Sequence, residues 1–257
     1  MPPATTHPGS QSARGTVVGA IPARYGSTRL PGKPLLPLAG RPMIEHVHRR
    51  VLEAPGLDRV VVLTDDERIA AVVERFGGEV ELTPVECASG TDRIAWAARS
   101  WQGVAAVVNI QADEPLIDPE AVGRVARHLV AHPEDPIVTL AVRAEPEEED
   151  AAAAVKVVCD LAGYALYFSR SRIPFPRHGN APAVRPRKHV GIYGYQRDAL
   201  LRFAELPPSP LEEVEALEQL RALENGMRIR VIEGGRPAPG VDTPEDLAKV
   251  ERMMRNG

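Results

Sequence analysis

The sequence predicts an α/β fold in which helices flank a mixed, mostly parallel β-sheet. From Thr16 onward, short apolar runs alternate with longer segments of helical period, which is the pattern of a sheet wrapped by helices. Hydrophobic residues make up 44% of the chain and charged residues 26%, close to the average of soluble globular proteins. A chain of 257 residues is also long enough to bury a sizeable core.

The first half of the chain predicts one complete strand–helix–strand unit followed by two further strands. We expect strands at 16–23, 59–64, 105–111 and 137–142. We expect helices at 43–53, from Asp65 or Asp66 to Gly77-Gly78, at 94–99, and from Asp118 onward. An aspartate side chain can cap the first turn of a helix, and glycine tolerates the left-handed turn that ends one.

The second half contains shorter strands. Strand-like runs at 155–159, 164–169 and 189–195 are interrupted at 174–188 by a stretch rich in Pro, Arg and His, which is typical of a mobile loop, either a dimer arm or a lid. Helices are expected from 210 to about 223 and from 244 onward, because Ser209-Pro210 and Thr243-Pro244 each combine a capping residue with proline at the first helical position.

The domain is expected to span 16–257. Residues 1–15 are rich in Pro, Thr and Ser and contain no long apolar run, so they predict a disordered leader rather than a signal peptide. No later run reaches the ~18 to 20 apolar residues of a membrane span.

Charge and cysteine content exclude several classes of function. Lys and Arg number 31 against 35 Asp and Glu, so the chain has no overall basic field for nucleic acid or an anionic membrane. Cys87 and Cys159 form no CxxC, which excludes a disulfide framework and a cysteine zinc site and favours a reducing compartment. We therefore expect a cytoplasmic protein with neither nucleic acid nor membrane as a partner.

A cationic loop follows the first predicted strand. Residues 22–34 (PARYGSTRLPGKP) carry Arg24, Arg29 and Lys33 among small residues. Ligands of open α/β sheets bind outside the carboxyl ends of the strands, where this loop begins. Small residues let the backbone approach a phosphate while the cations supply charge, so the loop predicts a polyphosphate site. The alternative is a solvated surface turn that its arginines keep soluble.

This loop differs from the two common nucleotide-binding motifs. The spacing from Gly26 to Gly32 is one residue too long for a P-loop, and Pro34 stands where Ser or Thr would hold magnesium. No G-x-G-x-x-G sequence occurs there either. These differences disfavour a P-loop NTPase, including a GTPase-like switch, and a Rossmann dehydrogenase.

Two acidic motifs are candidates for a metal site. In 109–115 (NIQADEP) an apolar strand ends at Asp113, and one such aspartate together with substrate phosphates and water can hold Mg²⁺. In 240–244 (GVDTP), Asp242 comes directly before the capping residue of a helix. Ordinary turn or helix-start acids have the same pattern. Similarly, Arg93 in 89–93 (SGTDR) is either a ligand of an acidic substrate or a helical arginine on a solvated face.

Eight segments of the chain resemble one enzyme family. They occur in family order from about Val17 to Val250: IPARYGSTRLPGKPL, SGTDR, VNIQADEP, AVKVV, GYALYFSRSRIPF, KHVGIYGY, SPLEEVEALEQLR and GVDTPEDL. They resemble the 3-deoxy-manno-octulosonate cytidylyltransferases, the CMP-Kdo synthetases of lipopolysaccharide assembly, and GYALYFSR and LEQLR separate this family from CMP-sialic acid synthetases. The resemblance implies a nucleotidyltransferase-type, Rossmann-like fold with a smaller dimerisation and sugar-pocket subregion at roughly 155–225.

The resemblance also implies roles for individual residues. The implied nucleotide-binding residues are Arg24, Ser27, Arg29, Lys33 and Gln111. The implied catalytic residues are Arg24, Lys33, Asp113 and Asp242, the last two as Mg²⁺ ligands. The implied sugar-pocket residues are Arg93, Gln111, His189, Tyr193, Glu218 and Gln219. The chain departs from the family in two places, because Ala112 replaces the usual glycine before the metal aspartate and the segment 177–188 is shorter than in many relatives.

The reaction implied by the resemblance is CTP + 3-deoxy-D-manno-octulosonate (Kdo) → CMP-Kdo + diphosphate, carried out by an expected homodimer. The 2-hydroxyl of Kdo would attack the α-phosphorus in line with the departing diphosphate, which requires mainly positioning and charge neutralisation. Two alternatives remain: a cytidylyltransferase for 8-amino-Kdo or a sialic acid, and a module that binds CTP without turnover.

Overall fold

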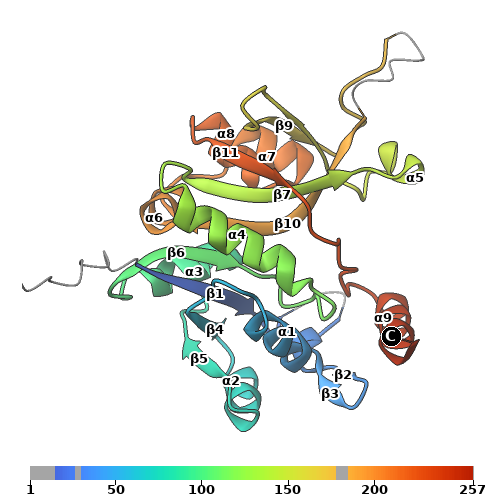
Figure 1. Cartoon of the computed structure of the whole chain (residues 1–257). Helices are drawn as coiled ribbons and strands as arrows, with labels where there is room; N and C mark the ends of the chain where they lie inside the picture. The colour runs from blue at the N-terminus through green and yellow to red at the C-terminus, as the bar shows by residue number, and fades with distance from the viewer. Residues whose placement is uncertain (1–14, 27–29, 178–184, 257) are drawn as a thin grey trace, which may run out of the picture.

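The computed structural model describes residues 15–26, 30–177 and 185–256. The expected leader therefore lies outside the described residues except for Gly15, as do Ser27, Arg29 and the middle of the expected loop at 174–188. Within the described ranges the chain forms a mixed nine-stranded sheet with helices on both faces (Figure 1), which confirms the predicted α/β class. None of the helices in these ranges is both long and apolar enough to cross a bilayer.

Four neighbouring strands of the sheet are parallel to one another, and an antiparallel strand joins them to the remaining strands. The strands of the main path are, in spatial order, β11 (Ile229–Glu233), β7 (Ile137–Arg143), β10 (Arg187–Gln196), β6 (Val104–Asn109), β1 (Thr16–Ala23), β4 (Arg59–Thr64) and β5 (Glu79–Leu82). β6, β1, β4 and β5 run parallel to one another, β10 is antiparallel to both β6 and β7, and β11 is parallel to β7. A hairpin of β8 (Lys156–Cys159) and β9 (Ala165–Ser169) attaches to β10.

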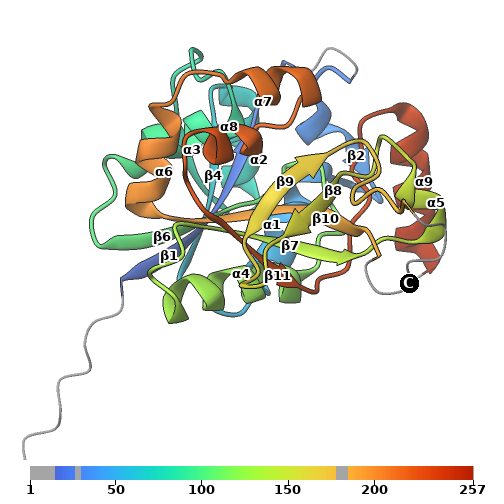
Figure 2. The same ribbon diagram turned by 90° about the horizontal axis from the view of Figure 1, so that it is seen from above.

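Helices cover both faces of this sheet. They are α1 (Met43–Leu52), α2 (Glu67–Arg75), α3 (Gly90–Ala98), α4 (Pro119–Ala131), α5 (Pro146–Glu149), α6 (Arg197–Ala204), α7 (Pro210–Glu215), α8 (Gln219–Glu224) and α9 (Pro244–Asn256). A 3-10 turn, η1 (Lys33–Leu35), and a small pair of strands, β2 (Pro37–Leu38) and β3 (Arg41–Pro42), precede α1. Figure 2 shows α4 on one side of the sheet and α3 and α6 on the other.

The alternation of side chains along β1 explains why both faces are covered. Val17 and Ile21 pack into the core that contains residues of α1 and α4, whereas Val18 and Ala20 pack into the core that contains residues of α3 and α6, and all four are fully buried. Successive side chains of a strand point to opposite faces, so an apolar strand needs a layer on each side. Each fully buried Val or Ile contributes about 1.5–3 kcal/mol.

Four predicted boundaries are wrong by two residues or more. The strand predicted at 189–195 begins at Arg187, inside the loop that was expected at 174–188. The strand predicted at 105–111 ends at Asn109, so the residues after it form a turn. The helix predicted at 94–99 begins at Gly90, because the side chain of Ser89 accepts from the Asp92 amide at 3.1 Å in a capping box. The helix predicted from 210 to about 223 is interrupted at Ala216, whose φ of 51° separates α7 from α8.

A buried carboxylate joins four elements at the end of the sheet that lies away from the loop after β1. The fully buried side chain of Asp135 accepts hydrogen bonds from Tyr164 Oη at 2.6 Å, His128 Nε2 at 2.7 Å and Arg230 Nε at 2.9 Å. Desolvation alone would raise the pKa of Asp135, but these three donors outweigh it and lower the pKa to about 2.

Asp135→Asn is expected to lower the free energy of unfolding by about 2–3 kcal/mol, because an amide cannot accept from all three donors. A carboxylate whose pKa is lowered on folding stabilises the protein above its unfolded pKa of about 3.9 and stops doing so as the pH falls through about 2. Urea denaturation between pH 7 and pH 2 should therefore show this loss in the wild type and not in the variant. Asp198→Asn is the control, since that side chain is 98% exposed. An equal change in the free energy of unfolding in both variants would contradict the prediction.

Candidate active site

The loop after β1 folds back so that η1 lies at the carboxyl edge of the sheet. The Gly32 amide donates to the carbonyl of Tyr25 at 3.0 Å, and the Lys33 amide donates to the carbonyl of Leu30 at 3.1 Å. Gly32 has a φ of +69°, and a Cβ there would lie 3.0 Å from the Tyr25 ring. Only glycine meets both conditions without strain, so Gly32 allows the turn that presents Lys33.

The ammonium group of Lys33 contacts two carboxylates from distant segments. Lys33 Nζ donates to Asp113 Oδ2 at 2.7 Å and to Asp242 Oδ1 at 3.0 Å, although the partners are 80 and 209 positions away in the chain. Burial alone would lower the pKa of Lys33, but the charges and hydrogen bonds of Asp113 and Asp242 outweigh burial and raise it. Lys33 therefore stays cationic at neutral pH and neutralises the repulsion between the two acids.

Backbone contacts explain how Asp242 reaches Asp113. The Val241 amide donates to the Asp113 carbonyl at 2.9 Å, which places the next residue, Asp242, beside Asp113. Thr243 and Asp246 then form reciprocal hydrogen bonds at the start of α9. The side chain of Val241 is buried in a small core with residues of β2, α1 and α9, so the whole segment is held against the edge of the sheet.

The two carboxylates fit a magnesium ion that is completed by substrate. Their side chains are 29% and 48% exposed, so oxygens of both remain accessible from the cavity beside them. No group of three or more His, Cys, Asp or Glu able to hold a metal occurs in the described parts of the chain. Magnesium commonly uses one or two carboxylates with phosphates and water as its other ligands, and this pair meets that requirement.

Glu114 adds an acid to this edge without adding a full charge. Desolvation, followed by the neighbouring charge of Asp113, raises the pKa of Glu114 to about 8. Glu114 is therefore mostly protonated at pH 7. The charged carboxylates around Lys33 are those of Asp113 and Asp242.

Two cavities adjoin at this edge of the sheet. The smaller, about 540 Å³, is lined by Lys33, Asp113 and Asp242 together with Arg93 and the turn at 87–90. The larger, about 1230 Å³, lies between the start of α3, the end of β6, β10 and the corner between α7 and α8. Residues that line both cavities are Arg24, Cys87, Ala88, Ser89, Gly90 and Gln111.

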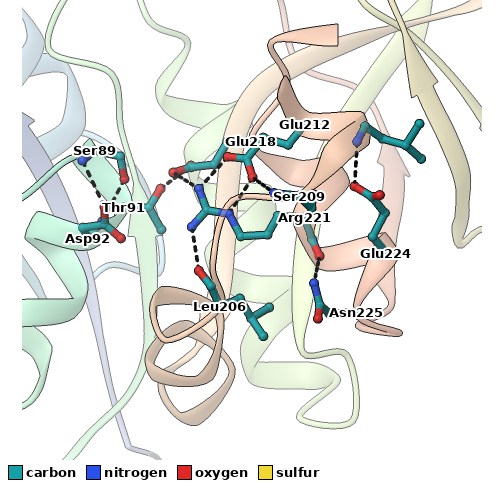
Figure 3. Close-up of polar contacts among 11 residues, drawn as sticks. Ser89, Thr91, Asp92, Leu206, Ser209, Glu212, Glu218, Arg221, Glu224 and Asn225 are labelled. Atoms are coloured by element: carbon teal, nitrogen blue, oxygen red, sulfur yellow. Dashed lines mark hydrogen bonds and ion pairs between the residues drawn. The ribbon is translucent and has the colours of Figure 1, made fainter. Parts of the chain in front are cut away.

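The wall of the larger cavity contains polar atoms that have no hydrogen-bond partner among the described residues. They are Asn109 Oδ1, Tyr193 Oη, Glu218 Oε1 and Gln219 Nε2, all of them buried. Around them, Thr91 Oγ1 donates to Glu218 Oε2 at 2.6 Å, and Arg221 forms an ion pair with Glu212 (Figure 3). Buried polar atoms are nearly always paired in folded proteins, so unpaired atoms in a cavity wall indicate a polar ligand.

The structure brings most of the predicted site residues together. Arg24, Lys33, Asp113 and Asp242 line the smaller cavity, Tyr193, Glu218 and Gln219 line the larger, and Gln111 lines both. The sequence analysis missed Thr91, Asn109, Glu212 and Arg221, which also line the larger cavity. The capping pattern of SGTDR and the polar end of β6 were signals for Thr91 and Asn109, and the capping box from Ser209 to Glu212 was a signal for Glu212, whereas nothing local in the sequence marks Arg221.

Arg93 and His189 differ from the expectation that they line the sugar pocket. Arg93 is buried at the smaller cavity, where its guanidinium pairs with Asp65 at 3.2 Å. His189 packs 5.2 Å from the Tyr193 ring and hydrogen-bonds Thr139 at 2.9 Å, and it is not among the residues that line the larger cavity. Burial lowers the pKa of His189 to about 4, so it is neutral at pH 7 and supports Tyr193 from behind.

Comparisons with known proteins agree on one family. A family model described as cytidylyltransferase matches residues 18–229. The 3-deoxy-manno-octulosonate cytidylyltransferases of Syntrophotalea carbinolica and Myxococcus xanthus are each 48% identical to this chain, covering 93% and 95% of it and 99% and 98% of their own lengths. A solved structure of CMP:2-keto-3-deoxy-manno-octonic acid synthetase complexed with CTP has a TM-score of 0.89 at 44% identity, covering 94% of this chain and 99% of that one.

A more distant structure shares the fold alone. A cytidylyltransferase from Leptospira borgpetersenii superposes with a TM-score of 0.64 at 18% identity, covering 94% of this chain and 87% of that one.

Arg93→Ala is expected to lower the free energy of unfolding by about 3 kcal/mol, because it leaves the mostly buried Asp65 carboxylate without its cation. Arg99→Ala is the matched control at the exposed end of the same helix. Urea denaturation of both variants measures the difference. Equal stability of the two variants would show that the pair with Asp65 is not what holds Arg93.

Proposed function

The chain belongs to the 3-deoxy-manno-octulosonate cytidylyltransferase family, and on that premise we propose that it transfers CMP from CTP to Kdo and releases diphosphate. The observation that carries this proposal is the convergence of Lys33, Asp113 and Asp242 beside a second, larger cavity with unpaired polar atoms. The product, CMP-Kdo, would serve lipopolysaccharide biosynthesis, and we propose a cytoplasmic enzyme.

The smaller cavity suits the triphosphate of CTP. Lys33 and Arg24 supply positive charge there. From the resemblance we also assign Ser27 and Arg29 of the same loop to nucleotide binding. Ser89 and Gly90 belong to the N-terminal turn of α3, where backbone amides and the helix dipole favour an anion. The Gly90 position packs against Pro22, since a Cβ there would lie 3.0 Å from Pro22 Cγ, so the first turn of α3 lies directly beside the end of β1.

The larger cavity suits the sugar acid. Unpaired acceptors of the wall match the hydroxyl groups of Kdo, and the unpaired amide of Gln219 can donate to an oxygen. Gln111 lines both cavities, so it can contact either the nucleotide or the sugar at their junction. Tyr193, Glu218 and Gln219 are therefore our sugar-binding residues, with His189 behind Tyr193.

The transfer needs positioning and charge more than covalent chemistry. The 2-hydroxyl oxygen of Kdo forms a bond to the α-phosphorus, the bond from that phosphorus to the bridging oxygen breaks with its electron pair going to the departing diphosphate, and the hydroxyl proton passes to water. Lys33 and Arg24 offset charge on the triphosphate, and the two cavities hold the reactants side by side. We propose Mg²⁺ as the cofactor, held by Asp113 and Asp242, where it would stabilise charge on the phosphates and lower the pKa of the attacking hydroxyl.

We also propose a homodimer that uses the part of the chain around 155–225. Large apolar side chains are largely exposed there, at Leu161 and Leu166 next to and in β9, Phe175 after it, and Val214 in α7. These exposed apolar side chains, all from one region of the chain, support the proposal, because apolar surface is commonly covered at an interface.

Diphosphate release should be rapid with CTP, Mg²⁺ and Kdo together and should fall to background when any one is omitted or when EDTA removes the metal. Sialic acid and 8-amino-Kdo in place of Kdo test the alternative sugars, and ATP or UTP in place of CTP tests the base. Faster turnover with another sugar acid would show that this sugar acid, and not Kdo, is the substrate. CTP binding without release with any sugar acid would instead support the non-catalytic module.

Asp113→Asn and Asp242→Asn should each lower kcat roughly a hundredfold or more, because each change removes one carboxylate from the metal site. Lys33→Ala should raise the KM for CTP and lower kcat, because the cation that faces the triphosphate is lost. Lys249→Ala, at an exposed position of α9, is the matched control. Native melting temperatures with unchanged kinetics in all three variants would show that this cluster is only a structural ion pair.

A further inference from the structure

Thr91 links the start of α3 to two groups in the wall of the larger cavity. Its hydroxyl lies 2.6 Å from Glu218 Oε2, at the corner before α8, and 3.4 Å from Asn109 Nδ2, at the end of β6. Thr91 is 2% exposed and Asn109 is 4% exposed, so water competes little for these contacts. All three residues line the larger cavity.

The chemistry of these groups fixes the direction of each hydrogen bond. A carboxylate oxygen accepts, so Thr91 donates its single hydroxyl proton to Glu218. Thr91 Oγ1 then has only lone pairs to offer Asn109, so Asn109 turns its amide nitrogen toward Thr91 and its carbonyl oxygen away from it. One hydroxyl group thus orients two side chains from different elements.

This arrangement leaves two acceptor oxygens in the cavity wall without a hydrogen bond. Asn109 Oδ1 and Glu218 Oε1 are both buried, and neither has a hydrogen-bond partner among the described residues. A buried acceptor without a donor costs about 1–3 kcal/mol, which a ligand that brings a hydroxyl donor recovers. Arg221 lies 3.8 Å from Glu218 Oε1, outside hydrogen-bond distance, and its guanidinium is held by Glu212.

We infer that Asn109 binds a hydroxyl group of the sugar acid through Oδ1, next to Glu218, and that Thr91 is the positioning residue for both acceptors. This inference rests on the proposed function, because it takes the polyhydroxylated substrate as the ligand of the larger cavity. The side of the cavity that recognises hydroxyl groups is then the one formed by the carboxyl end of β6 and the corner between α7 and α8.

The test compares isosteric variants in steady-state kinetics with Kdo and CTP varied separately. Asn109→Leu and Thr91→Val should each raise the KM for Kdo roughly tenfold and leave the KM for CTP within about twofold of the wild type. Thr91→Ser, which keeps the hydroxyl, should restore the wild-type KM for Kdo. Thr16→Val, at the opposite end of β1, is the matched control and should change neither constant.

Two further measurements separate binding from a structural role. The double variant should raise the KM for Kdo by less than the product of the single effects, because both changes remove one unit. Asn109→Leu should change the melting temperature little, because the hydrogen bond to Thr91 that it removes is long, at 3.4 Å, and the acceptor Oδ1 that it removes has no hydrogen-bond partner among the described residues.

Three outcomes would overturn the inference. One is an unchanged KM for Kdo in both single variants while the wild type turns over Kdo, which leaves the proposed function intact. Another is an equal rise of both KM values together with a lower melting temperature, which indicates a structural role. The third is a wild type that does not turn over Kdo with CTP, which overturns the proposed function and this inference with it.

Discussion

The parallel pairing of β1 with β4 and β6 decides where chemistry occurs in this protein. In the observed register Ala23 lies beside Thr64 and Ala20 lies beside Asn109, so the segments that follow β1 and β6 leave the sheet at the same edge. Both strands are buried on their two faces, which leaves this edge as the place where polar side chains of the central strands meet solvent. One backbone hydrogen bond, from the Val241 amide to the Asp113 carbonyl, then adds the segment before α9 to that edge.

Charge balance at this edge is close to neutral before any substrate is present. Lys33 lies between Asp113 and Asp242, Glu114 is mostly protonated at pH 7, and Arg93 is paired with Asp65. A nucleoside triphosphate would therefore add several negative charges to a site whose described cations, apart from Arg24, are already paired with carboxylates. This deficit is a physical reason for a divalent cation to accompany the nucleotide, and the same carboxylates that Lys33 holds in place are the groups able to bind that cation.

The sequence predicted features that depend on neighbouring residues and missed those that depend on distant ones. The boundaries of β1 and β4, and the helix starts at Asp66, Asp118 and Ser209, follow from apolar runs and capping residues. The interruption at Ala216 could not be predicted, because alanine favours helix and nothing local opposes it. The strands β5 and β11 were missed because they lie at the sheet edges and carry alternating polar residues. That Lys33 and Asp242 belong to one site was implied by the family resemblance alone, and their direct contact was not predicted, since no local pattern joins residues 209 positions apart.

Helix α3 connects the two halves of the site. Its N-terminal residues Ser89 and Gly90 line both cavities, and Thr91, in the same turn, reaches Glu218 on the far wall of the larger one. The reciprocal hydrogen bonds between Ser89 and Asp92 hold this turn rigid, and the close packing of Gly90 on Pro22 fixes it to the end of β1. The separation between the cavities is thus set by a capped helix on a central strand rather than by mobile side chains. A rigid separation between the cavities favours a transfer reaction, because the two bound reactants must be aligned for the reaction to occur.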